Sequence, residues 1–403
     1  MRRTTVTAAI ALFAISGLAL AGCAGGATPE GSASGGGDPI KVAVFGGIGA
    51  EGILANNSTT SVTSAKASVA AVNAAGGILG RQVEIDVIDD TGDPTVAVTK
   101  LQELLAGDNA PSVVMNSGPS TVADAMLPIL TQNNIISFNI GPTATSGDPT
   151  TNPYNFDLSP SAQNYIDAFV PEIKDRKFDS VAVLHGSSAY GELFGKLAAS
   201  TFADSGLDVT GSQGFDNASL DMTPQLEALK ETNPDVLVLD AYGAPLGYVL
   251  QSLDKLGWTV PIIGNTSVAA TGLISTEPPT GVLGTAQVKN LTMQVFNSTV
   301  YNADDTAVND AVKLMLQNGE IKSSLINAYN YDAMWLVKAA AESAGSLDAQ
   351  AVADALIDPA VQDAAKTVIL TKYGFTSDSH APHAATSEYA FIPPGKLVNG
   401  QYQ

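Results

Sequence analysis

The sequence predicts an α/β protein made of two doubly wound lobes. After residue 39, short apolar strands alternate with amphipathic helices, the pattern of parallel sheets covered by helices. The alternation runs through the chain twice, before and after a polar, proline-bearing bridge at residues 152–160. A length of 403 residues also favours two domains over one.

The clearest single unit covers residues 40–90 and is a strand, helix and strand in succession. An apolar strand is expected at residues 40–45. Apolar residues then recur at helical spacing: Val62, Ala65, Val69 and Val72. Gly76 and Gly77 can end this helix, because glycine accepts left-handed backbone without a steric cost. Alternation predicts a strand at residues 82–88, so the crossover is expected to be right-handed.

The remaining elements follow the same pattern. Strands are expected at residues 112–115, 135–138, 180–185, 208–215, 236–240 and 261–264. Helices are expected at residues 95–106, 120–132, 162–173, 191–205, 223–232 and 246–256 and, after a second polar bridge at residues 281–290, at 306–318, 325–343 and 349–357. In doubly wound sheets, ligands bind outside the carboxyl ends of the strands, so two lobes are expected to share one cleft.

The charge balance is strongly acidic, with 40 acidic and 19 basic residues and a formal charge of −21. This argues against nucleic acid and against a polybasic membrane surface. It fits a soluble protein whose affinity is for small molecules, although acidity that only secures solubility would look the same.

The amino-terminal segment predicts a lipid anchor. Arg2 and Arg3 precede an apolar run at residues 6–20 that is too short to span a bilayer comfortably. Leu-Ala-Gly then leads into Cys23, the single cysteine, in an arrangement that resembles a bacterial lipobox. We therefore expect a lipoprotein signal peptide at residues 1–22, lipidation of Cys23, and a Gly/Ser-rich tether at residues 23–38. The alternative is an ordinary signal peptide with a chance cysteine.

Three motifs carry a resemblance to a known family. They are the run from Asn73 to Arg81 with the acids and proline that follow it at 89–94, Ala-Tyr-Gly-Glu around Tyr190, and Ala-Tyr at Tyr242. In this order they resemble the branched-chain (Leu/Ile/Val) amino-acid binding proteins of ABC importers, from residue 40 to the carboxyl terminus.

The resemblance implies a type I periplasmic binding fold, with two Rossmann-like lobes joined by three crossing strands. The crossings are expected near residues 152–160, 281–294 and 367–375. Lobe one would contain residues 39–157 and 289–367, and lobe two residues 158–288 and 368–403.

The function implied is that of an extracytoplasmic solute-binding protein anchored to the cell membrane. It would capture a branched-chain or other amino acid, or a related carboxylate or amide, by hinge closure of its lobes. It would then deliver this solute to a membrane permease that has a separate ATPase. The resemblance implies a monomer, no cofactor, no metal and no catalytic residue.

The resemblance also places the ligand site. In lobe one, the family binds a carboxylate with positions that match Asn116, Ser117, Gly118, Asn139 and Gly141. The start of a helix at Ser120 suits an anion, and Ser120 could also cap that helix. The alternative is a turn with a helix cap and no ligand.

In lobe two, the matching aromatics are Tyr190 and Tyr242, whose rings can bury apolar ligand surface. Packing of these rings within their own lobe is the alternative.

Two positions depart from the family. Thr266 follows Asn265 where amino-acid binders place the carboxylate that pairs with the ligand's ammonium group, and Asn57 stands where an aromatic is common. Asp240 or Glu51 could replace the missing acid. A buried ammonium without an anion is costly, so the ligand could also lack an ammonium group.

Other readings of the sequence are weaker. A Gly-x-Gly-x-x-Gly run ending at Gly52 matches a dinucleotide fingerprint, but the first acid at a strand end, Asp89, lies 37 residues further on instead of about 20. His380 and His383 flank a proline and are expected in a surface loop, not at a metal. The functional rivals are a ligand-sensing receptor of the same fold with a signalling partner and a secreted α/β hydrolase, although the latter lacks a Gly-x-Ser-x-Gly motif.

Overall fold

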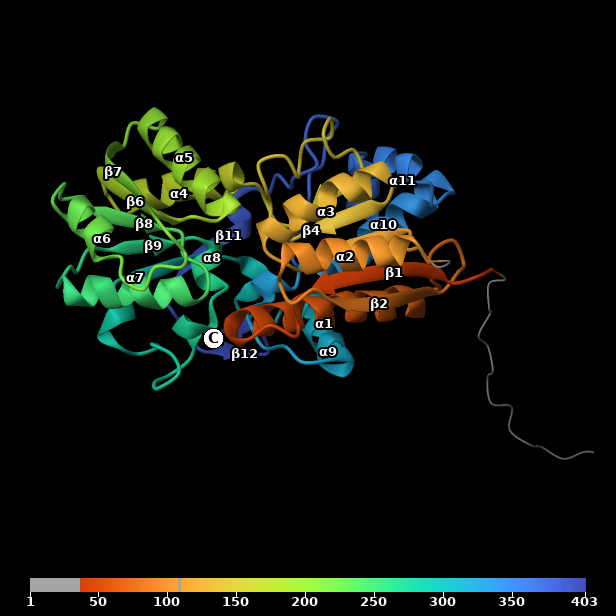
Figure 1. Ribbon diagram of the computed structural model, residues 1–403, viewed down its shortest axis with the longest axis horizontal. Helices are drawn as coiled ribbons and strands as arrows, with labels where there is room; N and C mark the ends of the chain where they lie inside the picture. The colour runs from red at the N-terminus through yellow and green to blue at the C-terminus, as the bar shows by residue number, and fades with distance from the viewer. Residues whose placement is uncertain (1–36, 108–109) are drawn as a thin grey trace, which may run out of the picture. The chain divides into compact units, whose positions relative to one another are not determined.

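The computed structural model describes residues 37–107 and 110–403, which contain two helix-flanked sheets (Figure 1). The predicted signal peptide, Cys23 and nearly all of the tether lie outside the described residues. Within these residues, no helix has the length and apolar character needed to cross a bilayer. The predicted α/β class is confirmed.

The first sheet is parallel and has the strand order β2-β1-β3-β4-β5. Its strands are β1 (Ile40–Gly46), β2 (Val83–Asp89), β3 (Val113–Asn116), β4 (Ile136–Asn139) and β5 (Asn155–Asp157). The flanking helices are α1 (Gly52–Ala74), α2 (Pro94–Leu105), α3 (Ser120–Gln132), α9 (Thr306–Asn318), α10 (Asn330–Ala344), α11 (Ala349–Leu356) and α12 (Pro359–Ala364).

Alternation along the central strand β1 explains why helices cover both faces of this sheet. Ala43 and Phe45 belong to a cluster with side chains of α2 and α3. Val42 and Val44 point the other way and join a cluster that includes α1 and α10. Both faces of β1 are buried, which explains why its sequence is a continuous apolar run.

The second sheet has the strand order β11-β10-β9-β8-β6-β7, in which only β11 is antiparallel to its neighbour. Its strands are β6 (Ser180–Gly186), β7 (Asp208–Phe215), β8 (Val236–Leu239), β9 (Ile262–Gly264), β10 (Leu291–Phe296) and β11 (Tyr389–Ile392). Its helices are α4 (Ala162–Asp175), α5 (Ala189–Asp204), α6 (Thr223–Lys230), α7 (Ala244–Lys255) and α8 (Thr266–Ala269). A hairpin of β12 (Leu397–Val398) and β13 (Gln401–Tyr402) ends the chain.

The second crossing lies later than the predicted residues 281–294. Strand β10 pairs with β9 in the second sheet, with Leu291 opposite Ile262, so the assignment of residues 289–296 to lobe one is wrong. The apolar segment that forms β10 extends the sheet before the chain leaves it. Strand β5 lies within the first predicted crossing and β10 overlaps the second, whereas β11 was not predicted.

The third crossing also lies later than the predicted residues 367–375. The backbone amides of residues 368–370 donate to Asp332 of α10, and the amide of Asp157 donates to the carbonyl of His380 (2.9 Å). Further along, the amide of Ala384 donates to Asn164 Oδ1 of α4 in the second lobe (3.1 Å). Residues 368–380 therefore lie with the first lobe, contrary to the predicted division.

Candidate functional site

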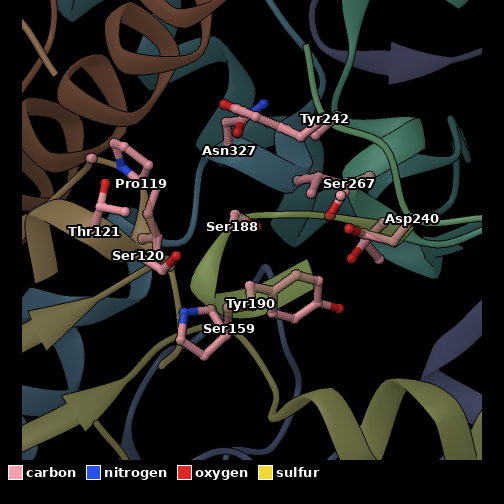
Figure 2. Close-up of a pocket in the computed structure, with 18 of the residues that line it drawn as sticks. Pro119, Ser120, Thr121, Ser159, Ser188, Tyr190, Asp240, Tyr242, Ser267 and Asn327 are labelled. Atoms are coloured by element: carbon pink, nitrogen blue, oxygen red, sulfur yellow. The ribbon is translucent and has the colours of Figure 1, made fainter. Parts of the chain in front are cut away.

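A cavity of about 370 Å³ lies where the strand-end loops of the two sheets meet (Figure 2). Residues 117–121 and 140–142, which follow β3 and β4, form one wall. Residues 186–188, Asp240 and Tyr242, which follow β6 and β8, lie on the other. Figure 2 shows Ser120 and Thr121 on one side of the space and Asp240 and Ser267 on the other.

The first-lobe wall is the amino-terminal end of α3. This helix begins at Ser120, its N-cap position is Pro119, and no side chain caps it, so the expectation that Ser120 caps the helix is wrong. The first amides of a helix have no partner within it, and they carry the positive end of its dipole. Uncapped amides that face a cavity are suited to bind an anion.

Gly141 packs directly against the backbone at the start of α3. A β-carbon at this position would stand 2.8 Å from the backbone nitrogen of Ser120 and 3.1 Å from the carbonyl oxygen of Gly118. Real β-carbons essentially never come this close to a backbone atom, so any other residue here would displace one of the two loops. Glycine at position 141 therefore lets the loop after β4 lie in contact with the start of α3.

Asn116 and Asn139 lie behind this wall and are absent from the cavity lining. Asn116 Nδ2 donates to Asn139 Oδ1 (3.1 Å), and Asn116 Oδ1 accepts from the amide of Gly118 (2.9 Å). Asn139 Nδ2 in turn donates to the carbonyl of Gly141 (2.7 Å). These two predicted site residues fix the shape of the two loops, while Ser117, Gly118 and Gly141 line the cavity.

Tyr190 lies in the first turn of α5 and forms part of the second-lobe wall. Its ring centroid lies 6.5 Å from that of Tyr165 and 6.1 Å from that of Phe194, so the ring packs within its own lobe while it also lines the cavity. Burial, followed by the nearby Asp240 carboxylate, raises the pKa of Tyr190 well above its usual value. The ring packs in its own lobe and keeps its phenol protonated beside the cavity.

Tyr242 connects the two lobes. Its side chain is 39% exposed, and its hydroxyl accepts a hydrogen bond from Asn57 Nδ2 of α1 (2.6 Å). Asn57 itself is 3% exposed and does not line the cavity. The predicted ligand residue Asn57 thus contacts the cavity lining through Tyr242.

Asp240 follows β8 and is the one charged residue in the cavity lining, as far as the structure describes the chain. It is 3% exposed, and its Oδ1 accepts from Asn265 Nδ2 (2.7 Å). Burial raises the pKa of Asp240, and the hydrogen bond from Asn265 opposes this shift. Thr266 lines the cavity, whereas Glu51 is exposed at the N-cap position of α1 and takes no part in the lining.

Several hydroxyl and amide groups of the lining carry no signal in the sequence that would mark them as site residues. Tyr165 and Tyr329 join their hydroxyls at 2.9 Å, and Ser159 lies 2.8 Å from the same oxygen of Tyr165. These residues come from segments that are far apart in the sequence, so no local motif marks them. The other polar residues that were not predicted are Thr121, Ser187, Ser188, Asn217, Ser267 and Asn327. Ser188 could have been found, because it stands at the N-cap position of α5 directly before Tyr190.

The described residues contain no cluster of three or more side chains arranged to hold a metal ion. His380 is buried, stacks on Phe156 with 4.0 Å between ring centroids, and contacts the carbonyl of Asn155 (3.0 Å). The prediction that His380 lies in a surface loop is therefore wrong. Burial lowers the pKa of His380, which suits a neutral ring in the core.

Comparisons with known proteins agree with this architecture. The profile of the family described as periplasmic binding protein matches residues 39–389. The Leu/Ile/Val-binding protein of Rhizobium johnstonii is 28% identical over 300 residues, which cover 73% of this chain and 77% of that protein. The Leu/Ile/Val-binding protein of Escherichia coli is 27% identical over 277 residues, covering 66% and 72%.

Solved structures give the same fold. The periplasmic binding protein type 1 of Bordetella pertussis superposes with a TM-score of 0.74 at 19% identity, covering 91% of this chain and 99% of that chain. An extracellular ligand-binding receptor of Rhodopseudomonas palustris gives 0.73 at 18% identity, with the same coverage.

Proposed function

Because this chain belongs to the periplasmic binding protein family, we propose that its cavity captures a small carboxylate-bearing solute for an ABC importer. One observation carries the proposal: an uncapped helix end and two tyrosines face each other across a cavity of about 370 Å³. This volume is in the range of small-molecule sites. The relatives named Leu/Ile/Val-binding proteins support an amino acid or a related carboxylate as the solute.

Each wall has a separate task in this proposal. The ligand's carboxylate accepts hydrogen bonds from the first amides of α3, next to Gly141, where the helix dipole favours negative charge. Tyr190 and Tyr242 cover the rest of the ligand with their rings and offer hydroxyls to its polar atoms. Asn116 and Asn139 keep the amides in place before the ligand arrives, so binding costs little conformational entropy at this wall.

Closure of the lobes completes capture. The hydrogen bond between Asn57 and Tyr242 joins α1 of the first lobe to the loop after β8, and it favours the closed arrangement. The crossing segments serve as the hinge, because they are the connections between two otherwise separate sheets. The closed form then docks, as a monomer, on a membrane permease that has a separate ATPase.

A matched pair of glycine substitutions tests the carboxylate site. Gly141→Ala places a β-carbon against the Ser120 amide and so must displace the start of α3 or the loop beside it, while Gly272→Ala places one in open space in the second lobe. We expect Gly141→Ala to weaken binding by at least about 10-fold, which is the loss of about 1.4 kcal/mol from one hydrogen bond to a charged group. Gly272→Ala is expected to leave affinity unchanged in isothermal titration calorimetry. Equal affinities for the two variants would contradict the proposed position of the carboxylate.

Anchoring by Cys23 belongs to the same proposal, since a lipid on this residue would hold the binding lobes near the permease. Cys23→Ala should move the protein from the membrane fraction to the soluble fraction of the cell envelope. Retention in the membrane fraction would contradict lipidation at Cys23.

A further inference from the structure

The hairpin of β12 and β13 contacts both lobes. Its strands pair with Leu397 opposite Tyr402, and they are joined by Asn399 and Gly400, whose φ angles are 52° and 83°. Positive φ at both central residues is the type I′ turn that asparagine and glycine favour in two-residue hairpins. The hairpin follows β11 of the second sheet, and its second strand is buried. A tight turn of this kind lets the two strands move as one unit.

The hairpin holds one end of α8 in the second lobe. Tyr402 is 1% exposed, and its hydroxyl donates to the backbone carbonyl of Ala269 (2.5 Å). Ala269 is the last residue of α8, so its carbonyl has no partner within that helix. Thr266, Ser267 and Ala270 of the same short segment line the cavity. The hydroxyl of Tyr402 therefore holds a helix whose residues form part of the cavity wall.

The turn of the hairpin contacts the first lobe. The carbonyl of Gly400 accepts a hydrogen bond from the amide of Leu325 (2.8 Å). Leu325 begins the 3₁₀ turn η4 (Leu325–Asn327), which lies between α9 and α10 and contributes Ile326 and Asn327 to the cavity lining. A β-carbon on Gly400 would stand 2.9 Å from the Leu325 side chain, so the hairpin lies directly on η4.

The hairpin also lies along the second crossing. The amide of Tyr301 donates to the carbonyl of Tyr402 (2.9 Å), and Gln401 Nε2 donates to the carbonyl of Ser298 (3.3 Å). Tyr402 belongs to one buried apolar cluster with residues of α8 and η4. The bonds to the two walls are thus made from a position at the hinge, and a movement that separates α8 from η4 must break one of them.

We propose that Tyr402 is a positioning residue of the ligand site and that the hairpin is a strap that fixes the spacing between α8 and η4. The strap joins a wall of the second lobe to a wall of the first. Because coupling between two sites is reciprocal, loosening either end of the strap loosens both walls. The effect of the strap on ligand affinity rests on the proposed function, whereas the mechanical link between the walls does not.

Two variants detach the strap, one from each lobe, and each has a matched control. Tyr402→Phe removes the hydroxyl and keeps the ring, while Tyr301→Phe removes a hydroxyl from a half-exposed ring. Gly400→Ala drives a β-carbon into Leu325 at a φ of 83°. Gly206→Ala has a φ of 85° with open space around its β-carbon, so it carries the same backbone strain without the clash. The variants are made in the full chain.

Hydrogen–deuterium exchange without added ligand tests the mechanical link. Mass spectrometry follows peptides that cover α8 and η4 at short exchange times, before global unfolding contributes. We expect Tyr402→Phe to accelerate exchange in α8 by about 2- to 12-fold, as for the loss of one neutral hydrogen bond, and to accelerate exchange in η4 as well. Gly400→Ala should accelerate exchange in both segments, and both controls should match the wild type.

Calorimetric titration tests the positioning role, with L-leucine, L-threonine and 4-methylpentanoate as probes. Circular dichroism establishes which variants are folded at the titration temperature, so a weaker affinity reports the site and not a loss of folded protein. A probe that binds the wild type should bind Tyr402→Phe and Gly400→Ala at least about 3-fold more weakly, and both controls within about 2-fold. Tyr402→Phe carries the test alone if Gly400→Ala does not fold.

Equal exchange in η4 for Tyr402→Phe and Tyr301→Phe would overturn the strap. A probe that binds the wild type and Tyr402→Phe with the same affinity would overturn the positioning role and leave the proposed function standing. If no probe binds the wild type, the proposed function and the positioning role fail together, whereas the exchange data still decide the strap.

Discussion

Removal of the Tyr242 hydroxyl should shift the closure equilibrium of the lobes by a predictable amount. Tyr242→Phe deletes the acceptor of the hydrogen bond from Asn57 Nδ2 (2.6 Å) and keeps the ring. A neutral hydrogen bond contributes about 0.5–1.5 kcal/mol net, which corresponds to a change of about 2- to 12-fold in the ratio of closed to open forms. Because only the closed form binds tightly, apparent ligand affinity should fall by up to the same factor.

Single-molecule fluorescence energy transfer measures this equilibrium without knowledge of the ligand. The fragment from Gly35 to Gln403, which forms one compact unit, lacks the only cysteine of the chain, so two introduced cysteines can be labelled specifically. Lys100 on α2 and Lys230 on α6 are exposed positions, one in each lobe. Tyr301→Phe is the matched control, because this tyrosine is half exposed and its hydroxyl has no hydrogen-bond partner among the described residues.

A double-mutant cycle separates the Asn57–Tyr242 hydrogen bond from other effects of the two side chains. Asn57→Ala and Tyr242→Phe should be non-additive, with a coupling of about 0.5–1.5 kcal/mol in the closure equilibrium. Additive effects, or a closed fraction in Tyr242→Phe equal to that of Tyr301→Phe, would refute the reasoning.

The remaining predictions concern stability. Asp332 is buried and accepts the amides of residues 368–370 and the Tyr373 hydroxyl, so Asp332→Ala should lower the free energy of unfolding by at least about 3 kcal/mol in urea titrations. The exposed Glu342→Ala on the same helix should change it by less than about 1 kcal/mol, and equal losses would contradict the account. Burial raises the pKa of Asp157 to about 7, so the folded state binds a proton more tightly than the unfolded state does. The wild-type stability, taken relative to Asp157→Asn, should therefore fall by about 1.4 kcal/mol per pH unit between about pH 4 and pH 7. Chemical denaturation at several pH values measures both stabilities. If the unfolding free energies of the two proteins change with pH in parallel, Asp157 is not the group responsible.

The sequence predicted most elements of the fold because their signals are local. Strand β1 is an apolar run, and α3 has the predicted bounds because its helical pattern begins directly after Pro119. Strand β10 was expected only from the resemblance, as a crossing near residues 281–294, because it follows a polar, glycine-rich bridge and becomes a strand only by pairing with β9. The crossings were misplaced for the same reason, since contacts across the lobes, such as that between Ala384 and Asn164, decide where the chain passes over.

Lining residues could be predicted where a motif directly follows a strand. They could not be predicted where the direction of a side chain decides whether it faces the cavity. Ser117, Gly141 and Tyr190 line the cavity as the motifs implied. Asn139 belongs to the same motifs, yet its amide turns back onto Gly141, which is a matter of rotamer and local hydrogen bonding. Tyr329 joins the wall through packing between distant segments, and spacing in the sequence carries no information about such contacts.

The central claim is that the cavity between the lobes binds a small carboxylate-bearing solute. A thermal-shift screen of the refolded fragment from Gly35 to Gln403 tests it most directly, because refolding removes any ligand retained through purification. The panel contains amino acids, their amides, and small mono- and dicarboxylates. A ligand at about 100 times its dissociation constant should stabilise the wild type by about 2.7 kcal/mol and raise its melting temperature, while Gly141→Ala should show a clearly smaller shift at the same concentration. A panel without effect on the wild type, or an equal shift in Gly141→Ala, would contradict the claim.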